Sequence, residues 1–180
     1  MTFLSINMST FTIGNYAQYG QQYISDTNML VWIGSVGSVC TCLRFAWSFP
    51  LDYFSFKYVY GAMLLFEIVL SFTMPLAVKS EETYMIWVAL TYWCEGGHFT
   101  LAPAIYKKIF GSEGSRVFGI GFSFLGVASL FQIGFIALMA PYIGISGLYY
   151  VFGVFCIISL VILIFFFEQK AVDLSDNQLE

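Results

Sequence analysis

The run VFCIISLVILIFFF, at residues 154–167, is the feature that most limits what this chain can fold into. A bilayer core about 30 Å thick needs about 20 residues of helix to cross it, and such a run leaves little room for a soluble alternative. The stretches LLFEIVLSF and FIALM lead to the same conclusion. We therefore expect an all-α, polytopic membrane protein.

The composition agrees with a lipid environment. Only 10% of the residues are charged, whereas an ordinary soluble domain has about a quarter. Seven basic and eleven acidic residues cannot form a charged shell around a core of this size. The lipid bilayer is thus an expected partner, and nucleic acid is excluded because the chain has no basic stripe.

Six segments are predicted to cross the membrane and to form one bundle over residues 1–168. A short polar cytoplasmic tail is expected at 169–180. The first segment is rich in Thr, Ser and Asn, so we expect it to have one wet face or to be the end of a longer helix. The predicted spans cover about 2–20, 29–49, 58–78, 84–105, 117–140 and 143–167.

The positions of the basic residues predict the orientation of these spans. Only Lys79 falls on one side of the membrane, and the other six Lys and Arg residues fall on the opposite side. Both termini of this segment, and the loops at 50–57 and 106–116, are therefore expected in the cytoplasm. The residues on that side are Arg44, Lys57, Lys107, Lys108, Arg116 and Lys170.

The turn CLRFAWSFPLDYFSFK, at 42–57, combines charges with a tryptophan. An Arg at a helix end and an Asp across a short turn could pair and hold two helix ends together. The alternative is ordinary snorkelling and topology charge. The spacing of Arg44, Trp47, Asp52 and Lys57 resembles the loop between helices 8 and 9 of the major facilitator superfamily, although Leu43, Ser48 and Leu51 depart from its pattern.

A second resemblance lies in GGHFTLAPAIYKKIFG, followed by FGIGFSFLGVASL. These stretches are similar to helices 10 and 11 of the oxalate/formate antiporter and monocarboxylate transporter branch of that superfamily. The matching residues are Gly96, Gly97, Phe99, Pro103, Phe110 and Gly111. The resemblance implies that the chain is the C-terminal half, helices 7 to 12, of a twelve-helix secondary carrier. Its missing N-terminal half, from the same gene or a separate chain, would be a partner.

Glu95 and His98 are the first candidates for chemistry. Three residues apart on a helix, they share one face, and ionisable residues at membrane depth usually face a cavity or a partner. We expect them either to exchange a proton during transport or to fix the helix register as a hydrogen-bonded pair. Glu67 is expected to be a structural partner on a peripheral helix.

Other polar residues are candidates for contact with the solute. Asn7 and Asn15 could line a cavity from the first span, and Gln132 could face it from the fifth. Arg44 is the only basic candidate for holding a carboxylate. Each of these side chains could equally hold helices together, as polar residues in membranes often do.

The function expected from these residues is transport of a small organic solute, with a carboxylate as one option. The chain would then be part of a secondary carrier working by alternating access, and a fragment of a longer protein. The alternative is a membrane structural or assembly subunit that does not transport. We expect no enzyme activity, no cofactor and no metal site, because one His beside Cys94 and Glu95 offers too few ligands.

Overall fold

The computed structural model describes residues 1–167, which form helices joined by short turns. The elements are α1 (Thr2–Gly20), α2 (Thr27–Cys42), η1 (Leu43–Trp47), η2 (Phe49–Asp52), α3 (Phe56–Ala77), α4 (Glu81–Phe110), η3 (Gly111–Glu113) and α5 (Gly114–Phe166). This part of the chain contains no strand, so the all-α prediction is confirmed. The predicted tail at 169–180 lies outside the described residues.

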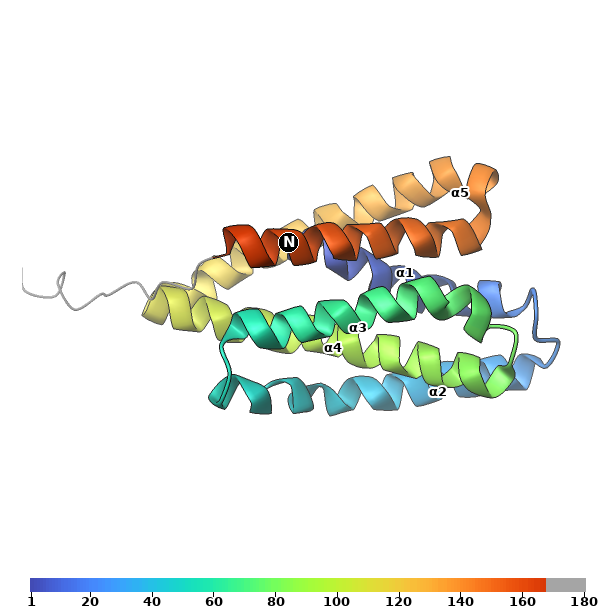
Figure 1. Ribbon diagram of the computed structural model, residues 1–180, viewed down its shortest axis with the longest axis horizontal. Helices are drawn as coiled ribbons and strands as arrows, with labels where there is room; N and C mark the ends of the chain where they lie inside the picture. Colours follow the sequence, from blue (N-terminus) through green and yellow to red (C-terminus); the bar gives the residue numbers. More distant parts are fainter. Residues whose placement is uncertain (168–180) are drawn as a thin grey trace, which may run out of the picture.

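Helix α5 consists of two rods that fold back on each other. Gly144, at φ 67° and ψ 177°, is the residue where the helical backbone is interrupted. A positive φ is open to glycine without steric cost, and Pro141 lies one turn before it. The sequence placed the break between residues 140 and 143, and the structure moves it to this glycine. Figure 1 shows the chain reversing direction there.

The connections between the helices gather at the two ends of the bundle. The α2–α3 connection, the α4–α5 connection and the end of α5 lie at the left in Figure 1. The α1–α2 and α3–α4 connections and the kink in α5 lie at the right. The basic residues of the two loops at 50–57 and 106–116 therefore share one end of the molecule.

Helix α1 lies inside the bundle, although it is the most polar of the helices. It packs against α5 and α4, and its residues Ser5, Asn7, Ser9 and Thr12 are buried. The polar side chains of its first half are thus turned inward, where other helices supply partners. The exposed residues of this helix lie in its second half, where Gly14 and Gln18 are exposed.

Three segments are long and apolar enough to cross a membrane: Thr27–Asp52, Phe56–Ala77 and Glu81–Phe166, which includes α4 and both rods of α5. Many large apolar side chains on them are exposed, among them Trp32, Leu65 and Ile133. Side chains of this kind are suited to contact with lipid. The predicted third span, 58–78, lies in α3, and the fourth, 84–105, lies within a longer α4.

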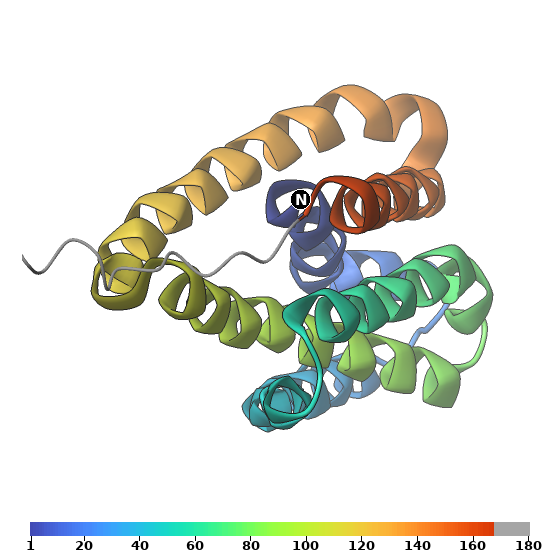
Figure 2. The same ribbon diagram turned by 60° about the vertical axis from the view of Figure 1, so that its left-hand side comes forward.

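The first rod of α5 stands at the margin of the bundle. Figure 2 shows it apart from the second rod, which lies beside α1 and α3. Between Gly114 and the kink only Gly114, Ala128 and Gln132 are buried. This rod therefore exposes most of its surface in the described part of the chain.

Candidate functional site in the helix bundle

The centre of the bundle holds a carboxylate and an imidazole in direct contact. His98 Nε2 lies 3.0 Å from Glu67 Oε1. Their exposed fractions are 2% for His98 and 0% for Glu67. Each residue lies about three helical turns from the end of the bundle that carries the basic loops. The antiparallel helices α3 and α4 thus bring the two groups to the same depth.

Tyr60 extends the pair along α3. Its hydroxyl lies 3.1 Å from His98 Nδ1 and 3.0 Å from Ser5 Oγ. The tyrosine and histidine rings meet edge to face, with centroids 5.6 Å apart. Both ring nitrogens of His98 therefore have a hydrogen-bonding partner. Two bonds of this kind fix the orientation of the imidazole and link α4 to α3 and α1.

Two further residues complete the shell around Glu67. Ser9 Oγ donates a hydrogen bond to Glu67 Oε1. Cys156 Sγ lies 3.9 Å from Glu67 Oε2 and 3.8 Å from the carbonyl oxygen of Ser5. The network therefore draws on α1, α3, α4 and the second rod of α5.

The network can hold a proton. If Glu67 is ionised and His98 is neutral, the pair carries one negative charge in an apolar interior, which is costly without compensation. One proton on either residue makes the pair neutral or a balanced ion pair. Among the described residues, His98 is the only basic group that contacts Glu67.

The structure changes the expected partner of His98. Glu95 is half-buried and makes no hydrogen bond to His98 within residues 1–167. His98 is turned toward α3, where Glu67 receives it. The alternative in which Glu95 and His98 form a hydrogen-bonded pair is therefore not found in the described residues. Glu67 was expected to be a structural partner on a peripheral helix, and it instead contacts His98 in the centre of the bundle. The sequence did contain a signal for the contact between Glu67 and His98, because the two residues lie at matching depths in consecutive predicted spans.

The turn after α2 is fastened by tryptophans instead of charges. Arg44 and Asp52 are exposed, and they form no ion pair in the described chain. Trp47 stacks on Trp93 with ring centroids 4.4 Å apart. Trp47 Nε1 donates to the Trp93 carbonyl, and Trp93 Nε1 donates to the Leu43 carbonyl, both at 3.2 Å. The expected Arg44–Asp52 latch is thus replaced by a tryptophan pair.

Lys57 makes a contact that its motif position did not indicate. Its Nζ donates to the carbonyl oxygen of Ile164 at 2.6 Å. Ile164 lies in the last turn of α5, where carbonyl groups lack helical partners and the helix dipole is negative. The lysine therefore ties the start of α3 to the end of α5.

The paired glycines of α4 permit close contact with two neighbours. A Cβ atom at Gly96 would lie 2.7 Å from Arg44 Cβ and 3.2 Å from the Thr41 carbonyl oxygen. At Gly97 it would lie 2.6 Å from Met63 Sδ and 2.9 Å from Trp47 Cδ1. The pair therefore lets α4 touch both the α2–η1 segment and α3.

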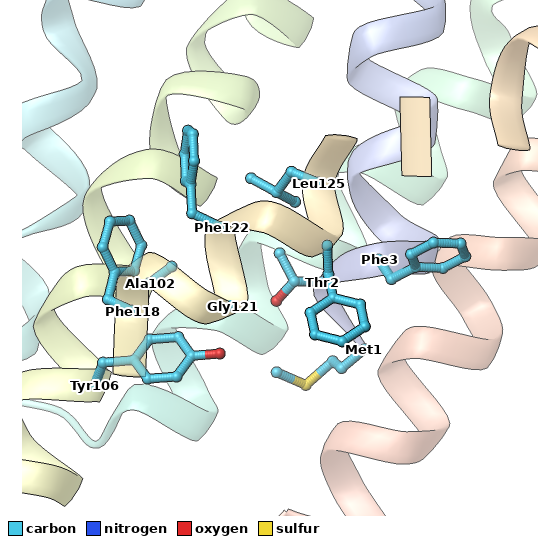
Figure 3. A pocket seen from close by; sticks show the side chains of 10 residues that line it. Met1, Thr2, Phe3, Ala102, Tyr106, Phe118, Gly121, Phe122 and Leu125 are labelled. Carbon is cyan, nitrogen blue, oxygen red and sulfur yellow. The ribbon is translucent and has the colours of Figure 1, made fainter. Parts of the chain in front are cut away.

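The second half of the α4 motif lies beside a cavity. Phe99 is half-buried, and its ring centroid lies 6.0 Å from that of Phe122 on α5. Helix α4 continues through Pro103 and ends at Phe110, and the next residue, Gly111, has a φ of 56°. A cavity of about 330 Å³ opens between the start of α1, the end of α4 and the start of α5. Figure 3 shows Tyr106 and Thr2 lining it from different helices.

The remaining polar candidates connect α1 to α5 or to α1 itself. Gln132 Nε2 donates to the Asn7 carbonyl at 2.5 Å and to Thr10 Oγ1 at 2.9 Å. Asn7 is buried, and its Oδ1 has no hydrogen-bonding partner in the described residues. Asn15 is half-buried and donates to the Phe11 carbonyl at 2.9 Å. Gln132 therefore joins two helices, which is one of the two roles expected for it.

Comparison with known proteins gives one informative similarity, and no family model matches the chain. The chain is 29% identical over 134 residues to a protein of Toxoplasma gondii named Apicoplast pyruvate carrier 1. The alignment covers 70% of this chain and 24% of that protein, so the chain spans about a quarter of its relative's length. Together with the apolar helices, this similarity identifies an integral membrane protein related to a transporter.

Proposed function

We propose that this chain is part of a membrane carrier for a small carboxylate, with pyruvate as the first solute to test. The observation that carries the proposal is the similarity to a pyruvate carrier over 70% of the chain. The apolar helices and the polar groups buried among them support it. A soluble function is inconsistent with the apolar surface of α3 and α5.

We further propose that the chain is the C-terminal half of a major facilitator carrier, with six spans and both termini of the segment in the cytoplasm. Support comes from the motif residues at Gly96, Gly97 and Pro103, and from the kink that divides α5 into two rods. The basic loops at one end of the bundle support the orientation. In this arrangement the exposed first rod of α5 contacts the other half.

Arg44 is the group we propose for holding the carboxylate. It is exposed in η1, just after α2, and it has no acidic partner among the described residues. A guanidinium group offers two parallel donors that match a carboxylate. Its backbone position is fixed because its Cβ packs against Gly96.

Uptake by the full-length protein tests this function. The protein would be reconstituted into vesicles and supplied with radiolabelled pyruvate, and unlabelled carboxylates and neutral solutes would serve as competitors. Saturable uptake that carboxylates inhibit and neutral solutes do not inhibit is the expected result. Uptake no faster than in protein-free vesicles would refute transport and favour a structural role.

Replacement of Arg44 tests the proposed carboxylate contact separately. Arg44→Gln is expected to raise KM for pyruvate by about ten- to a hundredfold, since one charge-assisted contact contributes about 1.5–3 kcal/mol. Lys107→Gln, which removes an exposed cation at the same end of the bundle, is the matched control. An unchanged KM in Arg44→Gln would remove this residue from the site.

A further inference from the structure

We propose that the Glu67–His98 pair is the proton-binding site of this carrier, and that Tyr60 connects it to a cavity in the bundle. The inference rests on the proposed transport function and deepens it, because it names the coupling ion and the atoms that hold it. It also assigns proton binding to Glu67 on α3, whereas the sequence indicated Glu95 on α4.

The first argument is the charge of the pair. Glu67 is wholly buried, and His98 is the one basic side chain among residues 1–167 that contacts it. With one proton the pair is electrically balanced, and without it the pair leaves a bare negative charge in an apolar core. Losing the proton is therefore favourable only when the packing around the pair opens to water.

The second argument is the surroundings of the pair. The facing groups that titrate are Tyr60 on α3, Cys94 and Glu95 on α4, and Cys156 on α5. Helix α1 contributes only the hydroxyl groups of Ser5 and Ser9. None of these groups is a cation. The proton itself is therefore the charge that balances Glu67.

The third argument is a route to the pair. Tyr60 and Thr2 line a cavity of about 230 Å³ with residues from the ends of α3 and α4. The Tyr60 hydroxyl lies 3.4 Å from Thr2 Oγ1 and 3.1 Å from His98 Nδ1. The side chain of Tyr60 thus lies between the cavity and the imidazole. A proton can pass from Thr2 through the Tyr60 hydroxyl to His98 over these two distances without movement of the backbone.

Each transfer step conserves protons. In the starting state Glu67 is ionised, and His98 carries its proton on Nε2. A proton from the cavity binds the Tyr60 oxygen as the hydroxyl proton passes to His98 Nδ1. The Nε2 proton then passes to Glu67 Oε1 across 3.0 Å. Tyr60 ends unchanged, His98 has switched tautomer, and Glu67 has gained one proton.

The pair also links proton binding to helix movement. Ser9 joins α1 to Glu67, and His98 joins α4 to α3. Helices α1 and α4 are two of the helices that line the solute cavity in the proposed carrier. If the pair binds a proton more tightly when these helices are packed together, proton binding shifts the carrier toward the packed conformation. A difference in affinity between the packed and the open conformation is what drives the shift.

Transport driven by a pH gradient is the first test. With one proton moved per solute, a gradient of one pH unit sustains about a tenfold accumulation of radiolabelled pyruvate. We expect the full-length Glu67→Gln carrier to lose this accumulation and to keep exchange of internal for external pyruvate. Exchange does not require the site to release its proton. Glu82→Gln, an exposed carboxylate on the same helix as His98, is the matched control.

Two outcomes of this test would overturn the proposal. One is Glu67→Gln accumulating pyruvate with the wild-type dependence on pH. The other is Glu95→Gln losing accumulation while Glu67→Gln retains it. A wild-type protein that moves no pyruvate would instead count against the transport function itself, and the second test below still decides the proton site.

Nitrogen NMR of labelled histidine is the second test, and it does not depend on transport. His98 is the single histidine of this chain, so the difference between wild type and His98→Gln isolates its signals in the full-length protein. We expect its tautomer to change with pH as the pair gains or loses its proton. Glu67→Gln should abolish that change. A wild-type signal that does not respond to pH would refute proton binding at this pair.

Discussion

Replacing Gly96 with alanine offers the sharpest test of how this bundle is packed. The added Cβ would lie 2.7 Å from Arg44 Cβ and 3.2 Å from the carbonyl oxygen of Thr41. Both atoms belong to or adjoin the backbone, so no side-chain rotation can relieve the contact. Relief requires the segment from Thr41 to Arg44 to move away from α4.

The magnitude follows from two opposing effects. Overpacking of a well-packed contact costs about 1–3 kcal/mol. Alanine in place of glycine inside a helix recovers about 0.5–1 kcal/mol. The net loss in the free energy of unfolding for Gly96→Ala is therefore about 0–2.5 kcal/mol, with a central value of about 1 kcal/mol. A loss of that size lowers the melting temperature by a few degrees.

The assay is the temperature at which half of the purified full-length protein in detergent loses its monodisperse peak in size-exclusion chromatography. Gly61→Ala is the control, because Gly61 is also a buried helical glycine and a Cβ there would lie 3.5 Å from Leu163 Cδ2, an ordinary van der Waals separation. We expect Gly61→Ala to melt at or above the wild-type temperature and Gly96→Ala to melt below it. Equal shifts in the two variants would refute the argument that Gly96 is required by close contact.

Three other variants test the contacts that join the helices, with the same melting assay. Trp47→Phe removes the donor to the Trp93 carbonyl and should cost about 1 kcal/mol, whereas an unchanged melting temperature would show that the stacking alone fastens the turn. Gln132→Leu removes both bonds to α1 and should cost about 1–2 kcal/mol; a more stable variant would contradict its role as a link. Glu67→Ala leaves His98 and Ser9 without their carboxylate and should cost about 3–5 kcal/mol, while a cost no larger than that of Glu67→Gln would count against the network.

The tryptophans and glycines show which contacts could be predicted from local sequence motifs and which could not. Gly96, Gly97 and Trp47 were recognisable from their motifs, and all three prove to be points of close contact. The motifs did not indicate that Trp47 pairs with Trp93, because no local pattern specifies which ring of a neighbouring helix will be opposite. The charged members of the same motif, Arg44 and Asp52, form no ion pair in the described chain.

The sequence by itself determined the environment and the class of fold. Apolar runs as long as 154–167 require lipid, and in lipid the backbone must satisfy its hydrogen bonds within helices. Gly144, near Pro141, and Gly111 marked the places where helices end, because few other residues tolerate a positive φ. These properties depend on residues close together in the chain, so they can be read without coordinates.

Only the tertiary structure decided which buried groups meet. Three residues separate Glu95 from His98 and thirty-one separate Glu67 from it, and local spacing favoured the nearer carboxylate. The rotation of α4 about its axis and its depth against α3 instead turn His98 toward Glu67. Those two quantities result from the packing of all the helices together, in which Gly97 against Met63 and Ser9 against Glu67 set the fit.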